Sequence, residues 1–67
     1  LMSDELFSML QVAAGHNGCT LTKNADIVSL TSPKGTLSVD IKAEALTNFE
    51  TFDTMMASLK DAALQRV

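Results

Sequence analysis

The order of apolar and polar residues predicts an amphipathic helix at the start of the chain. Over residues 3–14 the apolar side chains recur every three or four positions, at Leu6, Phe7, Met9, Leu10, Ala13 and Ala14. Ser3 is a residue type that caps helix N-termini, and the two carboxylates that follow it suit the positive end of the helix dipole. We expect the helix to end at Gly15 in a left-handed conformation, with a turn at Asn17-Gly18.

From Cys19 onward the pattern changes to the two-residue period of β-strands. Residues 19–22 and 26–31 alternate apolar and polar side chains, and residues 36–42 show the cleanest alternation in the chain. A turn at Lys23-Asn24 would separate the first two strands. The tetrapeptide Ser32-Pro33-Lys34-Gly35 predicts a tight turn between the last two, because proline presets φ and glycine can adopt a left-handed conformation.

The apolar positions on either side of this second turn predict how its strands pair. If Thr31 lies opposite Thr36, four apolar side chains fall on one side of the sheet, in the pairs Leu30–Leu37 and Val28–Val39. The other side of the sheet would then be rich in hydroxyl groups and nearly uncharged. Its members are Thr20, Ser29, Thr31, Thr36 and Ser38.

A second helix is predicted over residues 48–65. Thr47 and Glu50 form a Thr-x-x-Glu capping box before an apolar stripe, which consists of Phe49, Phe52, Met56, Leu59 and Ala63. We expect this stripe to face the sheet, while Met55 and Ala62 extend the apolar surface to a second flank. Residues 43–46, which precede the capping box, are either a connector or an early helical turn.

These elements predict an α+β fold: helix, three-stranded antiparallel sheet, helix, with both helices on one face of the sheet. We assign residues 2–67 to a single domain, because a chain of 67 residues is too short for two. Met2-Ser3 reads as a natural start, so we interpret Leu1 as the remnant of an expression tag.

Composition narrows the possible functions. Eight acidic and five basic residues give a net charge of −3, whereas proteins that bind phosphate backbones usually carry a basic excess. We find no signal peptide and no apolar run near the roughly 18 residues of a membrane span, so we expect a cytoplasmic protein without membrane contact. Cys19 is the only cysteine and cannot form an internal disulfide. We expect it to be a small buried hydrophobe.

No residue pattern in the chain indicates catalysis, a metal site or a cofactor. His16 is the only histidine, and we expect it to be exposed, without the partners that acid–base chemistry needs. Glu50 and Asp53 are best explained as a solvated start of the second helix. The remaining candidates are three scattered lysines (Lys23, Lys34 and Lys42) and three phenylalanines on helical stripes, which we expect in the core (Phe7, Phe49 and Phe52). We therefore predict that the protein is not an enzyme and has no cofactor and no metal ion.

The leading hypothesis is a small regulatory or interaction module that binds another protein. Such a module could be an inhibitor, an immunity or antitoxin-like factor, or an accessory protein of a phage or mobile element. We also expect a homodimer formed through the second helix, because small chains without disulfides or metals often gain stability by oligomerisation. The predicted partner-binding residues are Met55 and Ala62 on that helix, and Ser29, Thr31, Thr36 and Ser38 on the hydroxyl-rich face.

Two alternative functions come from different classes. The element order and chain length resemble those of double-stranded-RNA-binding domains, although no sequence motif of that family is matched. This resemblance implies a nucleic-acid-binding regulator as the second hypothesis. A small hydrolase or nuclease that uses His16 is the third hypothesis and has the least support in the sequence.

Overall fold

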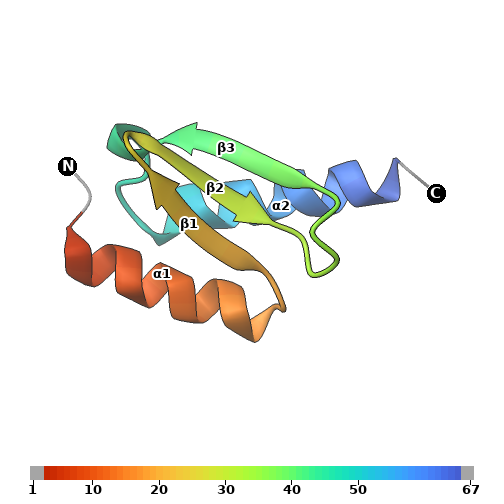
Figure 1. Ribbon diagram of the computed structural model, residues 1–67, viewed down its shortest axis with the longest axis horizontal. Coiled ribbons are helices and arrows are strands. Elements are labelled where there is room, and N and C mark those ends of the chain that lie inside the picture. Colours follow the sequence, from red (N-terminus) through yellow and green to blue (C-terminus); the bar gives the residue numbers. More distant parts are fainter. Residues whose placement is uncertain (1–2, 66–67) are drawn as a thin grey trace.

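The computed structural model describes residues 3–65 and confirms the predicted α+β fold (Figure 1). Its elements are α1 (Asp4–His16), β1 (Thr20–Asn24), β2 (Ile27–Thr31), β3 (Ser38–Lys42), a short 3₁₀ helix η1 (Ala43–Ala45) and α2 (Phe49–Leu64). The three strands form one antiparallel sheet in the order β1-β2-β3. Helix α1 packs on β1, and α2 packs on β2 and β3. Both helices contribute side chains to one core on one face of the sheet.

The core is centred on the middle strand. Val28 and Leu30 of β2 are fully buried, and they alternate with the half-buried polar residues Ser29 and Thr31. Around them lie the buried apolar side chains of the other elements: Leu10, Ala14, Cys19, Leu21, Leu46, Phe52, Met55, Met56 and Leu59. No polar or charged residue is buried in the part of the chain that the structure describes. The fold is therefore stabilised mainly by apolar burial and backbone hydrogen bonding.

Residues 43–46 combine the two interpretations that the sequence left open. They form a connector that contains one 3₁₀ turn, and the Leu46 N–H donates to the carbonyl of Ala43 at 3.1 Å. The Ala43 N–H donates to the carbonyl of Asp26 at 2.7 Å and thereby ties the end of β3 to the β1–β2 turn. Leu46 is fully buried, which the sequence pattern did not predict.

The end of α1 differs from the prediction. Gly15 is an ordinary helical residue, and the left-handed residue is Gly18, with φ of 74°. The Gly18 N–H donates to the carbonyl of Gly15 at 3.0 Å, and the Cys19 N–H donates to the carbonyl of Ala14 at 2.9 Å. This pair of bonds is the Schellman motif, which satisfies the last carbonyls of a helix. Because Ala14 and Cys19 are both buried, the motif places the helix end over the core.

The predicted pairing of β2 with β3 is wrong by two residues. In the structure Thr31 lies opposite Ser38, and the apolar pairs are Leu30–Val39 and Val28–Ile41. A shift of two residues leaves every side chain on its predicted face, because side chains alternate with a period of two. The apolar sides were therefore predicted correctly, but the cross-strand partners were not.

The β2–β3 loop explains this shift. The Ser32 N–H donates to the carbonyl of Leu37 at 2.9 Å, and the Leu37 N–H donates to the hydroxyl oxygen of Ser32 at 3.2 Å. These bonds close the hairpin at Ser32 and Leu37, one residue later on each side of the turn than the expected pair Thr31–Thr36. Gly35, with φ of 72°, donates its N–H to the carbonyl of Ser32 at 2.9 Å. Thr36 consequently lies in the loop and not on the sheet.

The β1–β2 turn also lies later than predicted. Strand β1 continues to Asn24, which pairs with Ile27, and the turn consists of Ala25 and Asp26. Ala25 has φ of 55°, a left-handed conformation that is uncommon for a residue other than glycine. The sequence pattern missed this turn because alanine carries no turn signal.

Helix α2 is capped by Asn48 rather than by Thr47. The Asn48 Oδ1 atom accepts from the Thr51 N–H at 2.9 Å and from the Thr51 hydroxyl at 3.1 Å. Thr47 and Glu50 therefore do not form the predicted capping box. Asparagine and threonine both cap helices well, and here the asparagine occupies the extended position that the cap requires.

The buried faces of both helices are rotated slightly from the predicted stripes. Phe49 is 43% exposed and Met9 is 55% exposed, whereas Met55 is only 3% exposed. At about 100° per residue, Phe49 lies about 70° from the centre of the buried face of α2, and Met9 lies about 100° from that of α1. The expected burial of Phe49 is therefore wrong, while Phe52 is buried and Phe7 is half-buried as part of the core.

Replacing Leu30 with alanine should lower the free energy of unfolding by about 2–5 kcal/mol, because it leaves a cavity in the middle of the core. The half-buried Val39, which lies opposite Leu30, provides the control: Val39→Ala should cost clearly less. Urea denaturation followed by circular dichroism measures both values. Equal losses for the two variants would contradict a core centred on β2.

The glycines near the end of α1 give a second test. Gly18→Ala should lower the free energy of unfolding by at least about 1 kcal/mol, because alanine disfavours a left-handed φ and its Cβ would lie 3.3 Å from Pro33 Cγ. Gly15→Ala should raise stability by about 0.5–1 kcal/mol, since an added Cβ meets nothing within 4 Å in this helical position. Thermal melts compare the two variants, and a destabilising Gly15→Ala would show that the helix ends earlier.

Candidate functional site

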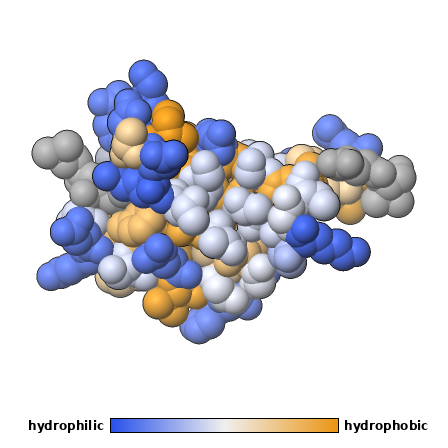
Figure 2. Space-filling view, in the orientation of Figure 1, coloured by the Kyte–Doolittle hydropathy of each residue, from blue (hydrophilic) through white to orange (hydrophobic). Residues whose placement is uncertain are grey.

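The open face of the sheet carries most of the predicted hydroxyl groups. Thr20, Thr31 and Ser38 lie side by side across the three strands, because Thr31 is opposite both of the others. Figure 2 views the molecule from this side and shows a pale central surface of intermediate hydropathy. Ser29 also lies on this face, but it is opposite Asp40, so a carboxylate lies among the hydroxyls. Thr36 is absent from the face because it belongs to the loop.

The proposed contact residues on α2 behave differently from the prediction. Met55 was expected to point away from the sheet, yet its side chain is 3% exposed and packs in the core. Ala62 is half-buried. The second flank of α2 is therefore used within the chain itself, and Met55 is not a surface residue. Homodimerisation stays a prediction, but Met55, the residue expected at the centre of the interface, is buried within the chain's own core.

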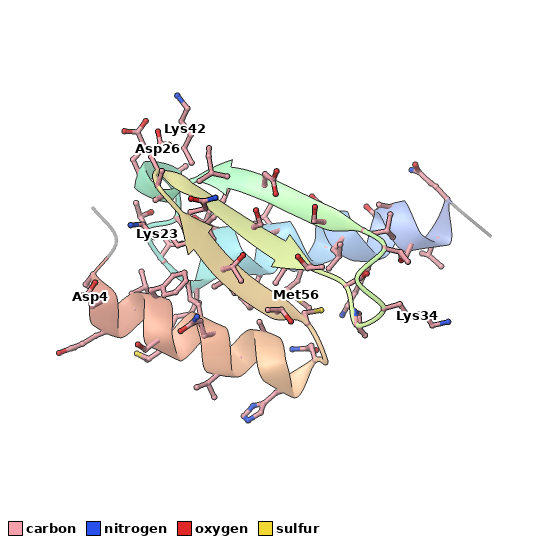
Figure 3. The ribbon with its side chains drawn as sticks, in the orientation of Figure 1. Asp4, Lys23, Asp26, Lys34, Lys42 and Met56 are labelled. Atoms are coloured by element: carbon pink, nitrogen blue, oxygen red, sulfur yellow. The ribbon has the colours of Figure 1, made fainter. Side chains whose placement is uncertain are left out.

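The candidate chemical residues belong to several different elements. His16 is exposed at the last turn of α1, as expected, and Cys19 is buried, as expected. Lys23 and Lys42 project at one end of the sheet, whereas Lys34 projects from the β2–β3 loop at the other end (Figure 3). Within residues 3–65 no three histidine, cysteine or carboxylate side chains are close enough together to hold a metal ion. None of the helices in that range is long and apolar enough to cross a membrane.

A groove beside the β2–β3 loop was not predicted from the sequence. One part has a volume of about 210 Å³ and is lined by Asn17, Cys19, Ser32, Pro33, Met56, Leu59, Lys60 and Ala63. The adjoining part has a volume of about 240 Å³ and is lined by Ser32, Pro33, Lys34, Thr36, Leu37 and Ala63. The two parts share Ser32, Pro33 and Ala63, so they form one surface depression. We call these eleven residues the hairpin groove.

Three segments that are distant in sequence form the walls of the hairpin groove: the α1–β1 connection, the β2–β3 loop and the second half of α2. Gly18 allows the first two to approach closely, because a Cβ atom there would lie 3.3 Å from Pro33 Cγ. The thiol of Cys19 donates to the carbonyl of Asn17 at 3.7 Å, within the α1–β1 connection. The turn that ends α1 therefore also shapes one wall of the groove.

The lining of the hairpin groove is apolar with a cationic rim. Met56 and Leu59 are buried and belong to the core, so the groove is an extension of the core to the surface. Among residues 3–65 its charged lining residues are Lys34 and Lys60, although the chain as a whole is acidic. No histidine or carboxylate side chain of that range lines it. This lining can bind apolar groups, but it offers no pair of groups for nucleophilic or acid–base catalysis.

No pattern in the sequence indicates this groove directly. Cys19 and Met56 were interpreted as core residues and Pro33 as a turn residue. Each interpretation agrees with the structure. The groove exists only because the fold brings these residues together, which a periodicity argument cannot foresee.

Comparison with known proteins adds no relationship: no protein-family model, curated protein or solved structure matches the chain significantly.

The burial of Met55 changes the expected effect of a charge at this position. Met55→Lys should destabilise the fold by several kcal/mol, because it places an ammonium group in an apolar core. Ala57→Lys provides the control, since Ala57 is exposed on the same helix and its substitution should change stability by less than about 0.5 kcal/mol. Thermal denaturation measures both. A Met55→Lys variant that melts like the parent would show that this flank of α2 faces solvent.

Proposed function

We propose that this protein is a small non-enzymatic interaction module that binds another protein and regulates it. The observation that carries the proposal is the hairpin groove, an apolar surface depression of three converging segments. Binding sites are typically concave and mostly apolar, with a few polar groups that fix orientation. Proteins of this kind include inhibitors, immunity or antitoxin-like factors, and accessory proteins of phages or mobile elements. The single cysteine fits action in the cytoplasm.

The distribution of charge favours a protein partner over a nucleic acid. Lys34 lies at the opposite end of the sheet from Lys23 and Lys42, so these lysines form no common patch (Figure 3). All the aspartate and glutamate side chains are exposed, and their carboxylates would repel a phosphate backbone. Phe49 is the only phenylalanine of the described residues that is largely exposed, which leaves little surface for base stacking.

Self-association through α2 remains part of the proposal. Leu64, near the end of this helix, is 72% exposed. This residue, rather than Met55, provides an apolar side chain that a second copy could contact. Sedimentation equilibrium at micromolar concentration should show a dimer that Leu64→Lys dissociates. A 7.2 kDa species at all concentrations would contradict the dimer.

Affinity purification from the cells that make the protein tests the function itself. We expect one protein to co-purify in a stoichiometric amount, and the two purified components to form the complex again in isothermal titration calorimetry. A gel-shift titration with DNA and RNA at two salt concentrations is run in parallel. Strong, salt-dependent nucleic-acid binding without any protein partner would overturn the proposal in favour of a nucleic-acid-binding regulator.

A further inference from the structure

We infer that the hairpin groove binds an acidic, apolar peptide segment of the partner: one or two apolar side chains enter the groove, and flanking carboxylates contact Lys34 and Lys60. This inference rests on the proposed function and adds the location and chemistry of the binding site. It is independent of the open face of the sheet, where other candidate partner-binding residues were placed.

The openness of the groove favours a peptide over a small organic ligand. Sites that hold a small molecule usually bury most of the ligand. Here the β2–β3 loop contributes exposed residues, Pro33, Lys34 and Thr36, so the groove is open along one side. Two shallow adjoining depressions suit successive side chains of a bound segment.

The charges that line the groove specify the chemistry of this segment. Lys60 lines one part and Lys34 lines the other, so each depression has one lysine side chain in its wall. Figure 3 shows Lys34 projecting outward from the loop, where it can reach beyond the edge of the groove. The charged side chains that the described residues contribute to the lining are both cationic, so they attract an acidic partner. Complementary charges of this kind raise association rates and exclude wrong partners.

Ala63 lies at the centre of this site. It is exposed, and it lines both depressions. An arginine at position 63 would occupy the groove without entering the core, so the fold should tolerate it. Ala57 is an exposed alanine on the same helix and does not line the groove. The pair Ala63→Arg and Ala57→Arg therefore separates blocking of the groove from a general effect of charge on α2.

Selection from a random 12-residue peptide library displayed on phage, with the immobilised wild-type protein, provides the probe. We expect the enriched peptides to combine Leu, Ile, Phe or Met with Asp or Glu. Synthetic fluorescent versions then give dissociation constants by fluorescence polarisation. Ala63→Arg and the charge reversal Lys60→Glu should each weaken binding about tenfold or more. Ala57→Arg and Lys42→Glu should leave it within about twofold.

Several results would overturn the inference. Enriched peptides that are basic or uncharged would refute the acidic chemistry, and acidic peptides that bind Ala63→Arg as tightly as the parent would refute the location. A dimer that only Ala63→Arg dissociates would assign the groove to a second copy of the chain. Oleate that binds the parent but not Ala63→Arg, with no acidic peptide enriched, would assign it to a fatty acid. In the first two cases peptide binding itself still supports an interaction module, so failure of this inference is distinguishable from failure of the proposed function.

Discussion

Val28 and Leu30 on the middle strand β2 are completely buried, and their burial is the constraint on which the rest of the structure depends. In a strand, side chains alternate between faces, so these two residues fix which side of all three strands faces the helices. Helices α1 and α2 must then cover that side, and they do so with Leu10 from α1 and Phe52 from α2 among others. The chain has no internal disulfide, so this one apolar core has to provide the stability of a 67-residue protein.

The same constraint explains what could be predicted from the sequence and what could not. Alternation in the strands determined the element order and the faces of the sheet, and these predictions hold even though the β2–β3 pairing differs by two residues. The pairing itself depends on hydrogen bonds between Ser32 and Leu37 in the loop, which hydropathy does not encode. The predicted apolar stripes of the helices were only partly right. Tertiary packing sets the rotation of α2 about its axis, which buries Met55 and leaves Phe49 exposed.

The hairpin groove could not be predicted from the sequence. It forms where the core approaches the surface between α2, the β2–β3 loop and the turn after α1. Met56 and Leu59 take part in both the core and the groove, so a ligand in the groove would contact residues that stabilise the fold. Binding and stability are consequently linked: a partner that binds only the folded state raises the apparent melting temperature.

Methionine methyl signals offer the most direct test of this account. Met56 lines the groove, Met55 lies in the core, and Met9 is exposed on α1. In the protein labelled with [methyl-¹³C]methionine, each of these methyl groups gives its own resonance. Addition of a bound partner segment should shift the Met56 signal strongly and leave the Met9 signal in place. A shift confined to Met9, or no shift at Met56 at saturation, would contradict the assignment of the groove as the binding site.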